Sequence, residues 1–247
     1  PNVIFLSDFG NQLYLEKTIG PYKVARQLRN AGYEVAVVHH LMAFSVTEIK
    51  HILKNLISDQ TLFVGVNNFF YKKIVDYDTV ELQYPDPHTI IPHGIEYNDE
   101  IKQTITDANP NCKLALGGPN ASDIPIYSDF DYIFLGYSEM SIINLAKHLQ
   151  YPMIDLDKSR ISKNGFAVID DSKAPEYDFV NHTMLYEDHD AILDHETLVV
   201  ELARGCIFQC KFCSYPLNGK SKLDFIRTEE SLYREFMDNY ERFGTTN

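Results

Sequence analysis

The chain has 247 residues, of which 45% are hydrophobic and 23% are charged, and its net charge is −13 at pH 7. This length can bury the core of one large domain or of two ordinary ones, and the composition is typical of a globular protein. The negative charge disfavours nucleic acid as a partner, and no apolar stretch approaches the roughly 20 residues that cross a bilayer. Three of the four cysteines are clustered, which argues against a disulfide scaffold and predicts a reducing compartment, the cytoplasm.

Short apolar runs alternate with helical patterns over residues 1–150. The expected strands span 3–7, 34–39, 62–66, 113–116 and 132–135. The expected helices span 19–31, a segment that begins after Ser45, 95–108 and 142–149. Ser45 and Glu48 have the spacing of a capping box, and residues 68–93 predict an insertion or a long loop. Buried strands that alternate with amphipathic helices pair in parallel, so an open, Rossmann-like α/β sheet is expected.

Three of the predicted strands end in residues that suit the close approach of a ligand. These ends are Ser7-Asp8, Asn67-Asn68 and Gly117-Gly118. In open parallel sheets, ligands bind beyond the carboxyl ends of the strands. Paired glycines let the backbone come close to a bulky ligand, although they are equally compatible with a plain tight turn. The sequence therefore predicts a ligand site at this edge of the sheet.

Residues 151–196 lose the regular periodicity and are expected to form a linker. A small hairpin around Asn164-Gly165 is predicted within it. Two acidic stretches that also carry histidine follow at 186–190 and 194–196. Their carboxylates and imidazoles could converge on a metal ion, or the two stretches could belong to a solvated linker.

Cys206, Cys210 and Cys213 have the spacing C-x3-C-x2-C. Three thiolates can hold a four-iron cluster by three of its irons and leave the fourth iron open to a ligand. The other cysteine, Cys112, lies in a different predicted element and is a poor candidate for a fourth ligand. A partial zinc site is the alternative, but zinc usually takes paired C-x2-C units and a fourth ligand, and no second pair exists.

The cysteines lie between a predicted strand and a predicted helix. Residues 197–202 predict the strand, and Thr228 is expected to cap a helix with Leu232, Phe236 and Tyr240 on its apolar face. A strand, a ligand loop and a helix form the first unit of a barrel whose sites lie where the strands end. The expected organisation is an α/β domain over 1–150, a linker over 151–196 and the start of a barrel over 197–247.

The run from Glu201 to Cys213 resembles the cluster-binding motif of the radical S-adenosylmethionine enzymes, in which an aromatic residue such as Phe212 precedes the third cysteine. The preceding Arg204-Gly205 is typical of the subgroup with an N-terminal cobalamin-binding domain. Residues 1–150 resemble that domain at Gly20-Pro21, 31–35, Gly117-Gly118-Pro119 and Gly136-Tyr137-Ser138-Glu139. The last of these keeps the first and last positions of the family's Gly-Glu-Gly-Glu turn.

The resemblance implies that Cys206, Cys210 and Cys213 ligate a [4Fe-4S] cluster whose open iron binds S-adenosylmethionine. One electron from an external reductant would cleave the sulfonium and yield a 5'-deoxyadenosyl radical that abstracts hydrogen from a small-molecule or peptide substrate. Cobalamin in the first domain would carry a methyl group or tune the radical chemistry. The residues implied at the cofactors, besides the cysteines, are Phe212, Asp8, Asn67, Gly117, Gly118 and Gly136.

The sequence departs from the family pattern at several points. The cobalt-binding Asp-x-His-x-x-Gly signature is absent after Asp8, Asn120 replaces a histidine that often follows Gly-Gly-Pro, and His39-His40 have the character of ordinary strand-end residues. A barrel needs on the order of 200 residues, so we expect the remaining strands in missing sequence or on a separate chain, and no catalysis by this chain alone. The alternative function is a ligand-binding or partner-binding α/β module with a cysteine zinc site.

Overall fold

A computed structural model describes residues 1–7, 16–67, 95–118, 130–156, 160–161, 166–171, 177–194, 196–212 and 225–244. The predicted loop at 68–93 and the residues Asp8, Asn120 and Cys213 lie outside these ranges. No helix in the described ranges is long and apolar enough to cross a bilayer.

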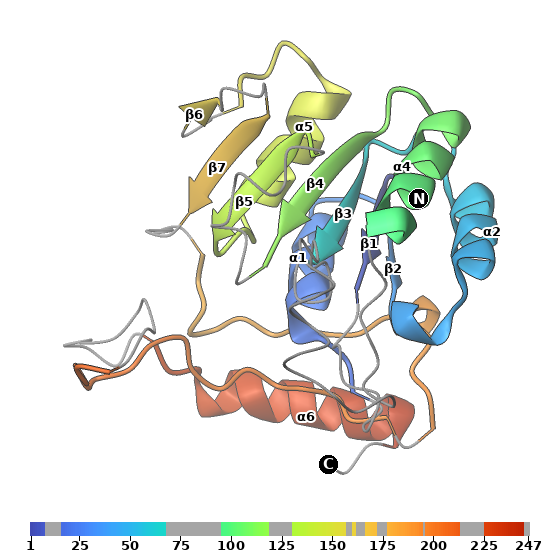
Figure 1. Ribbon diagram of the computed structural model, residues 1–247. Helices are drawn as coiled ribbons and strands as arrows, with labels where there is room; N and C mark the ends of the chain where they lie inside the picture. Colours follow the sequence, from blue (N-terminus) through green and yellow to red (C-terminus); the bar gives the residue numbers. More distant parts are fainter. Residues whose placement is uncertain are drawn as a thin grey trace.

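A mixed sheet with the order β2-β1-β3-β4-β5-β7-β6 forms the centre of the described structure (Figure 1). Its strands are β1 Val3–Leu6, β2 Val35–Val38, β3 Phe63–Asn67, β4 Lys113–Gly117, β5 Tyr132–Gly136, β6 Arg160–Ile161 and β7 Ala167–Asp171. All neighbouring strands pair in parallel except β6 and β7. The predicted open parallel sheet is therefore confirmed. The chain order reverses direction between β1 and β3, which is the switch point where such folds bind ligands.

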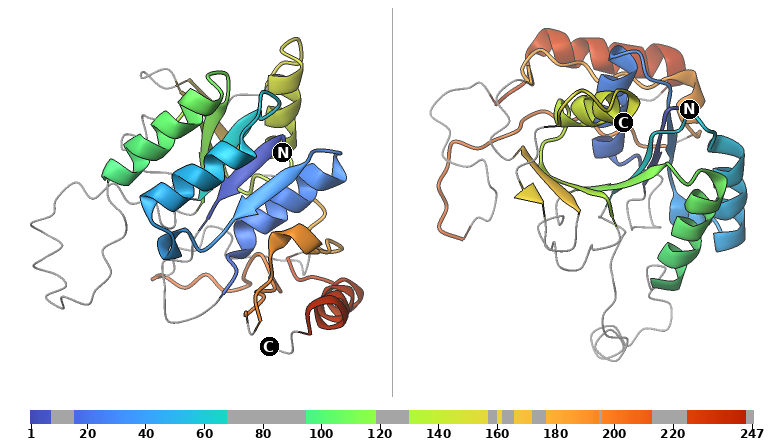
Figure 2. Two further views of the ribbon diagram at one scale, coloured as in Figure 1. Left: turned by 90° about the vertical axis from the view of Figure 1, so that its right-hand side faces the viewer. Right: turned by 90° about the horizontal axis from the view of Figure 1, so that it is seen from above.

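Helices cover both faces of the sheet (Figure 2). They are α1 Ile19–Asn30 and α5 Ser141–Gln150 on one face, and α2 Val46–Leu56 and α4 Ile95–Ala108 on the other. A further helix, α6 Glu229–Phe243, lies beyond the strand ends, and short 3-10 turns occur at Leu41–Ala43 and Asp188–Asp190. Alternate strand residues enter two apolar cores: Val3 and Phe5 pack with α1 and α5, whereas Ile4 and Leu6 pack with α2 and α4. Because both faces are buried, the strands are continuous apolar runs.

The predicted start of α2 is confirmed in atomic detail. The Ser45 hydroxyl accepts a hydrogen bond from the Glu48 N–H at 3.3 Å, and the Glu48 carboxylate accepts one from the Ser45 N–H at 2.7 Å. These bonds satisfy two of the donors that a helix start leaves free. The cap is local, so its two residues suffice to predict it.

The sheet extends into the range that was expected to be a linker. β6 and β7 form the predicted hairpin, although its turn lies outside the described residues. β7 also pairs in parallel with the whole of β5, from Tyr132 opposite Ala167 to Gly136 opposite Asp171. Residues 167–171 therefore belong to the sheet, because the open edge of β5 offers them backbone partners that no local pattern reveals.

The predicted strand over 197–202 is not present as a strand. Within the segment, Thr197 makes an isolated bridge to Glu16, and directly after it Ala203 makes one to Ile226. A strand requires a continuous hydrogen-bonded neighbour, and in the described ranges this segment has none. The start of a barrel over 197–247 is thus not seen as a strand with paired neighbours, whereas the following helix, α6, is formed.

The helix α6 begins at the predicted cap but turns a different face inward. Thr228 accepts a hydrogen bond from the Ser231 N–H. The buried positions are Ser231, Glu235 and Asn239, whereas Phe236 is 49% exposed and Tyr240 is 56% exposed. Of the three apolar positions named from the sequence, Leu232 is half-buried and the other two are exposed, because the segment beneath α6 presents polar backbone and an arginine that need partners. α6 lies beyond the arrow ends of the strands in Figure 1, on the side that α1 and α5 cover.

Candidate cofactor-binding site

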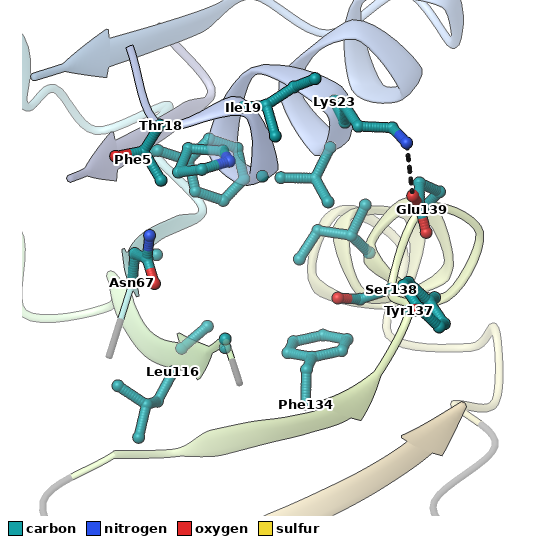
Figure 3. A pocket seen from close by; sticks show the side chains of 18 of the residues that line it. Phe5, Thr18, Ile19, Lys23, Asn67, Leu116, Phe134, Tyr137, Ser138 and Glu139 are labelled. Carbon is teal, nitrogen blue, oxygen red and sulfur yellow. Dashed lines mark ion pairs between the residues drawn. The ribbon is translucent and has the colours of Figure 1, made fainter. Parts of the chain in front are cut away.

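A cavity of about 340 Å³ opens at the carboxyl ends of β1, β3, β4 and β5, against the beginnings of α1 and α5 (Figure 3). Its wall is largely apolar and includes Phe5, Leu116, Phe134 and Ile142. This is the edge at which the sequence predicts a ligand site. The cavity spans the switch point between β1 and β3 and continues past it to β5.

The structure brings four of the predicted cofactor-binding residues to this one cavity. Asn67, Gly117, Gly118 and Gly136 all belong to its lining and come from the ends of three neighbouring strands. Gly118 has φ 115° and Gly136 has φ 82°, a region that side chains other than glycine rarely adopt. Asp8 lies outside the described residues. Phe212 is not part of the lining and is 91% exposed. That these residues bind a cofactor stays a prediction.

A buried network of four charged side chains forms one end of the cavity. The Arg204 Nη2 lies 2.6 Å from Glu139 Oε1 and 3.0 Å from Glu201 Oε2. Lys23 pairs with Glu201 and lies 3.8 Å from Glu139. Lys23 lies on α1, Glu139 lies just before α5, and the other two residues precede the cysteine loop. The network therefore joins the sheet domain to the segment that carries the cysteines.

Aromatic rings surround the Arg204 guanidinium. Its central carbon lies 3.9 Å from the centre of the Tyr137 ring and 4.8 Å from that of Phe179, distances at which a cation is attracted to a ring face. Burial opposes the charge of Arg204, but hydrogen bonds to Glu201 and the charge of Glu139 raise its pKa overall. Burial likewise opposes the charge of Glu201, but Arg204 and Lys23 lower its pKa overall. Arg204 and Glu201 are therefore charged at neutral pH.

Sequence reasoning missed the role of this network. Glu139 and Arg204 both belong to the motifs that carry the family resemblance, but no local pattern pairs two residues that are 65 positions apart. Lys23 lies between helix residues that are themselves buried, and no signal in the sequence marks it. Only the fold reveals that these side chains meet.

The cysteine loop begins two residues after Arg204. Its base is held by the Ala203–Ile226 bridge and by the Arg204 N–H, which donates to the Phe225 carbonyl at 2.7 Å. Cys206 is partly buried, Cys210 is exposed, and both are free thiols. The Phe208 N–H donates to Cys206 Sγ at 3.4 Å. The ranges that the structure describes contain no group of three metal-binding side chains, but Cys213 lies outside them, so the cysteine triad is not tested.

Cys112 is remote from this chemistry, as expected. It contacts the core on the α2 and α4 side of the sheet. Burial, reinforced by Asp131, raises the pKa of its thiol to about 12. The thiolate is the form that binds metal, so this protonated side chain is unsuited to be a ligand at neutral pH.

Two carboxylates of the acidic stretches with histidine pair with cationic side chains or histidine of the sheet domain, while His195 lies outside the described residues. Asp190 accepts a hydrogen bond from Arg29 at 2.6 Å, and Glu196 lies 2.6 Å from His40 and 3.3 Å from Lys17. Both carboxylates are 2% exposed. Burial raises the pKa of Glu196. Hydrogen bonds from His40 and the Leu193 N–H and the charge of Lys17 lower it, and the pKa ends below its usual value. These ion pairs fasten residues 187–196 to the sheet domain, and His40 has a structural partner here.

His182 is expected to make the protein less stable in mild acid. Its pKa is lowered to about 3, first by burial and then by the charges of Lys23, Arg227 and Arg204. A histidine in an unfolded chain titrates near pH 6.5. Between about pH 6.5 and 3, His182 is therefore protonated in the unfolded state but not in the folded state. Stability should therefore fall as the pH drops through this window. In urea unfolding at pH 7.5 and 5, His182→Gln should lose less stability than the wild type, and equal losses would contradict this account.

Comparisons with known proteins agree with this fold. No family model matches the chain, and no curated protein matches its sequence. Two solved structures of the radical S-adenosylmethionine methyltransferase TsrM from Kitasatospora setae are similar to it. The one with tryptophan and an analogue of S-adenosylmethionine has 18% identity and a TM-score of 0.58, over 98% of this chain and 46% of that one. The one with cobalamin and a [4Fe-4S] cluster has 17% identity and a TM-score of 0.60, over 98% and 47%.

A third similar structure is the apo form of OxsB, a cobalamin-dependent S-adenosylmethionine radical enzyme. It has 16% identity and a TM-score of 0.59, over 97% of this chain and 31% of that chain. The chain thus spans less than half the length of the proteins that it matches. The structural neighbours over nearly its whole length are cobalamin-dependent radical S-adenosylmethionine enzymes, and the resemblance seen in the sequence is confirmed for the fold.

Proposed function

We propose that this chain is part of a cobalamin-dependent radical S-adenosylmethionine enzyme. Cobalamin would bind at the cavity, and Cys206, Cys210 and Cys213 would hold a [4Fe-4S] cluster that binds S-adenosylmethionine. The observation that carries the proposal is the buried network of Glu139 and Arg204, which joins the cavity to the beginning of the cysteine loop. Two predicted cofactor sites that are distant in sequence thereby lie on one connected structure. Similarity to TsrM and OxsB supports the same assignment.

The cavity suits part of a cobalamin molecule. Its apolar wall and exposed glycine backbone allow a large, flat ligand to approach the strand ends. Its volume is near the lower limit for small-molecule pockets, so it can enclose only part of so large a ligand. No histidine belongs to the described lining, so a cobalt ligand from these residues is not expected. Asn67, Gly117, Gly118 and Gly136 would contact the ligand.

The described part of the cysteine loop suits a cluster. Two of the three thiols are free, and a backbone N–H already donates to Cys206 Sγ. Hydrogen bonds to the cysteine sulfurs are among the factors that set the potential of a cluster. The cluster would supply the electron that cleaves S-adenosylmethionine to a 5'-deoxyadenosyl radical, and the overall reaction would be a methyl transfer. Phe212, the exposed residue before the third cysteine, would lie beside these cofactors.

Iron loading tests the cluster. After anaerobic reconstitution with iron and sulfide, we expect about four irons per chain and a broad visible absorption, because three thiolates suffice to hold the cluster. Cys210→Ala should lose most of this iron, whereas Cys112→Ala, which removes a thiol on the other side of the sheet, should keep it. Equal iron in the Cys210 variant and the wild type would refute the cluster. Zinc in place of iron would favour a binding module with a zinc site.

Hydroxocobalamin binding tests the cavity. Among the described residues, a Cβ at Gly117 would meet the Phe134 Cβ alone, at 3.9 Å, so the strand tolerates a side chain there while the cavity loses space. We expect Gly117→Val to weaken binding, measured by absorbance titration, at least tenfold. Ala36→Val is the matched control, because it adds similar bulk on β2, away from the lining. Unchanged affinity in the Gly117 variant would argue against cobalamin in this cavity.

A further inference from the structure

The two carboxylate oxygens of Glu139 lie in different situations. Oε1 accepts a hydrogen bond from Arg204 Nη2 at 2.6 Å. Oε2 is fully buried and has no hydrogen-bond partner within the described ranges. The side chain is 5% exposed and belongs to the cavity lining, where Figure 3 shows it facing Lys23. One carboxylate thus touches the anchor of the cysteine loop and also borders the cavity.

A buried carboxylate oxygen without a hydrogen-bond partner suits a ligand that donates a hydrogen bond to it. Leaving a buried polar atom without a hydrogen bond costs about 1–3 kcal/mol, and more for a charged group, so folded proteins rarely do it. The Thr18 hydroxyl, which also belongs to the lining, is a second buried polar atom without a partner in the described structure. A ligand that brings an N–H or an O–H group to the Glu139 end of the cavity would satisfy Oε2, whereas Thr18 lies beside Phe5, across the cavity from Glu139 in Figure 3, and would need a second polar group of the ligand.

The charges near Glu139 restrict the chemistry of that ligand. Lys23 and Arg204 are balanced by Glu139 and Glu201. A charged ligand group would upset this balance in an otherwise apolar cavity, where the cost of an unpaired charge is high. A neutral donor, such as an amide or a hydroxyl, suits the site.

Arg204 links Glu139 to the cysteine loop through direct contacts. Its guanidinium pairs with Glu139 and stacks on Tyr137, which belongs to the same turn after β5. Its backbone N–H closes the base of the cysteine loop at Phe225, and Cys206 is two residues away. A shift of the turn after β5 therefore moves the loop as well.

We propose that Glu139 couples the occupant of the cavity to the cysteine loop: Oε2 accepts a hydrogen bond from a neutral N–H or O–H group of the occupant, while Oε1 holds Arg204 and so positions Cys206. Glu139 and Arg204 are positioning residues in this scheme. The identity of the occupant and of the cluster rests on the proposed function, but the anchoring of the loop does not. Because such coupling is reciprocal, an occupant that orders the loop is itself bound more tightly when the loop is ordered.

Thiol reactivity measures the coupling without any enzymatic activity. The rate at which iodoacetamide alkylates Cys206 in cluster-free protein is followed by mass spectrometry, with and without hydroxocobalamin. In the wild type, hydroxocobalamin should slow the reaction about fivefold or more, a typical size for such coupling. In Glu139→Gln the reaction should be several-fold faster in the free protein and should no longer respond to hydroxocobalamin.

Two further variants separate the two oxygens. Glu201→Gln loosens Arg204 while leaving Glu139 Oε2 in place, so Cys206 should react faster in the free protein, and hydroxocobalamin should still slow the reaction, unlike in Glu139→Gln. Arg204→Lys keeps the charge but loses the forked contacts, and it should also speed alkylation. Glu230→Gln, in an exposed ion pair on α6, is the control and should behave as the wild type. Melting curves verify that each variant is folded.

The outcomes distinguish the inference from the proposed function. If hydroxocobalamin binds the wild type but leaves Cys206 reactivity unchanged, the coupling is refuted and the proposed function stands. If hydroxocobalamin does not bind, the cobalamin assignment fails. The alkylation rates of Cys206 in the free protein then still test whether Glu139 and Arg204 hold the cysteine loop. Equal Cys206 rates in the wild type, Glu139→Gln and Arg204→Lys would refute the anchoring of the loop.

Discussion

Glu235→Ala is expected to lower the free energy of unfolding by about 3–5 kcal/mol, although Glu235 is a charged residue on a helix. Its carboxylate pairs with Arg227 at 2.8 Å, with side chains that are 0% and 2% exposed, and it accepts the Met184 N–H at 3.0 Å. Burial raises the pKa of Glu235, and Arg227 and the Met184 N–H oppose that rise. Removing the carboxylate leaves a buried guanidinium and a buried N–H without this partner. The loss should also detach α6 from the segment around Met184.

Phe236→Ser is the matched control on the same helix. A count of apolar residues predicts that it is the damaging substitution, whereas the structure exposes about half of this side chain. We expect a change below about 1 kcal/mol, as for other surface substitutions. Urea unfolding followed by circular dichroism measures both variants. A larger loss in Phe236→Ser than in Glu235→Ala would show that α6 is docked by its aromatic face.

Lys17→Met is the second substitution with a large expected effect, again about 3–5 kcal/mol. The Lys17 ammonium lies 3.3 Å from Glu196 and donates to the carbonyls of Asp190 and Ala191 at 3.1 and 3.2 Å. Burial lowers the pKa of Lys17 although Glu196 opposes this. Methionine fills a similar volume but leaves Glu196 with His40 as its remaining side-chain partner among the described residues. Residues 187–196 should then lose their attachment to the sheet.

Hydrogen exchange locates that effect. In Lys17→Met, amides of residues 187–196 should exchange faster, while those of β1 and β3 keep their protection until global unfolding. Lys50→Met is the control, because Lys50 pairs with Glu100 on the surface and such pairs contribute at most about 1 kcal/mol. Similar losses in the two lysine variants would mean that burial of the Lys17 pair has no special weight.

Local chemistry explains which elements were predictable. Val3–Leu6 is a short, unbroken apolar run, which is typical of a buried strand, and the capping box of Ser45 and Glu48 defines the start of α2 within four residues. β7 was not anticipated as part of the sheet, because membership depends on the free edge of β5. The face of α6 was mistaken, since its burial is decided by the partners of Glu235 and not by periodicity.

Some residues of the candidate site were likewise predictable from the sequence, and others were revealed only by the fold. Asn67, Gly117 and Gly118 were predicted because strand ends in a parallel sheet meet at one edge, whatever the details of packing, and Gly136 was predicted from the family resemblance. Lys23 gave no such sign, and Glu139, Glu201 and Arg204 were known only as motif residues. Their meeting depends on how residues 177–204 lie against α1 and the turn after β5.

The cysteine spacing and the alternation of strands and helices are properties of the chain itself, so the sequence alone determined the chemistry that its motifs suit and the class of the fold. The tertiary structure decided that a cavity at the sheet edge and the base of the cysteine loop share one buried set of charges. The physical reason is that ion pairs such as Glu139–Arg204 form between positions distant in sequence, where only the folded chain brings the partners into contact and removes them from water.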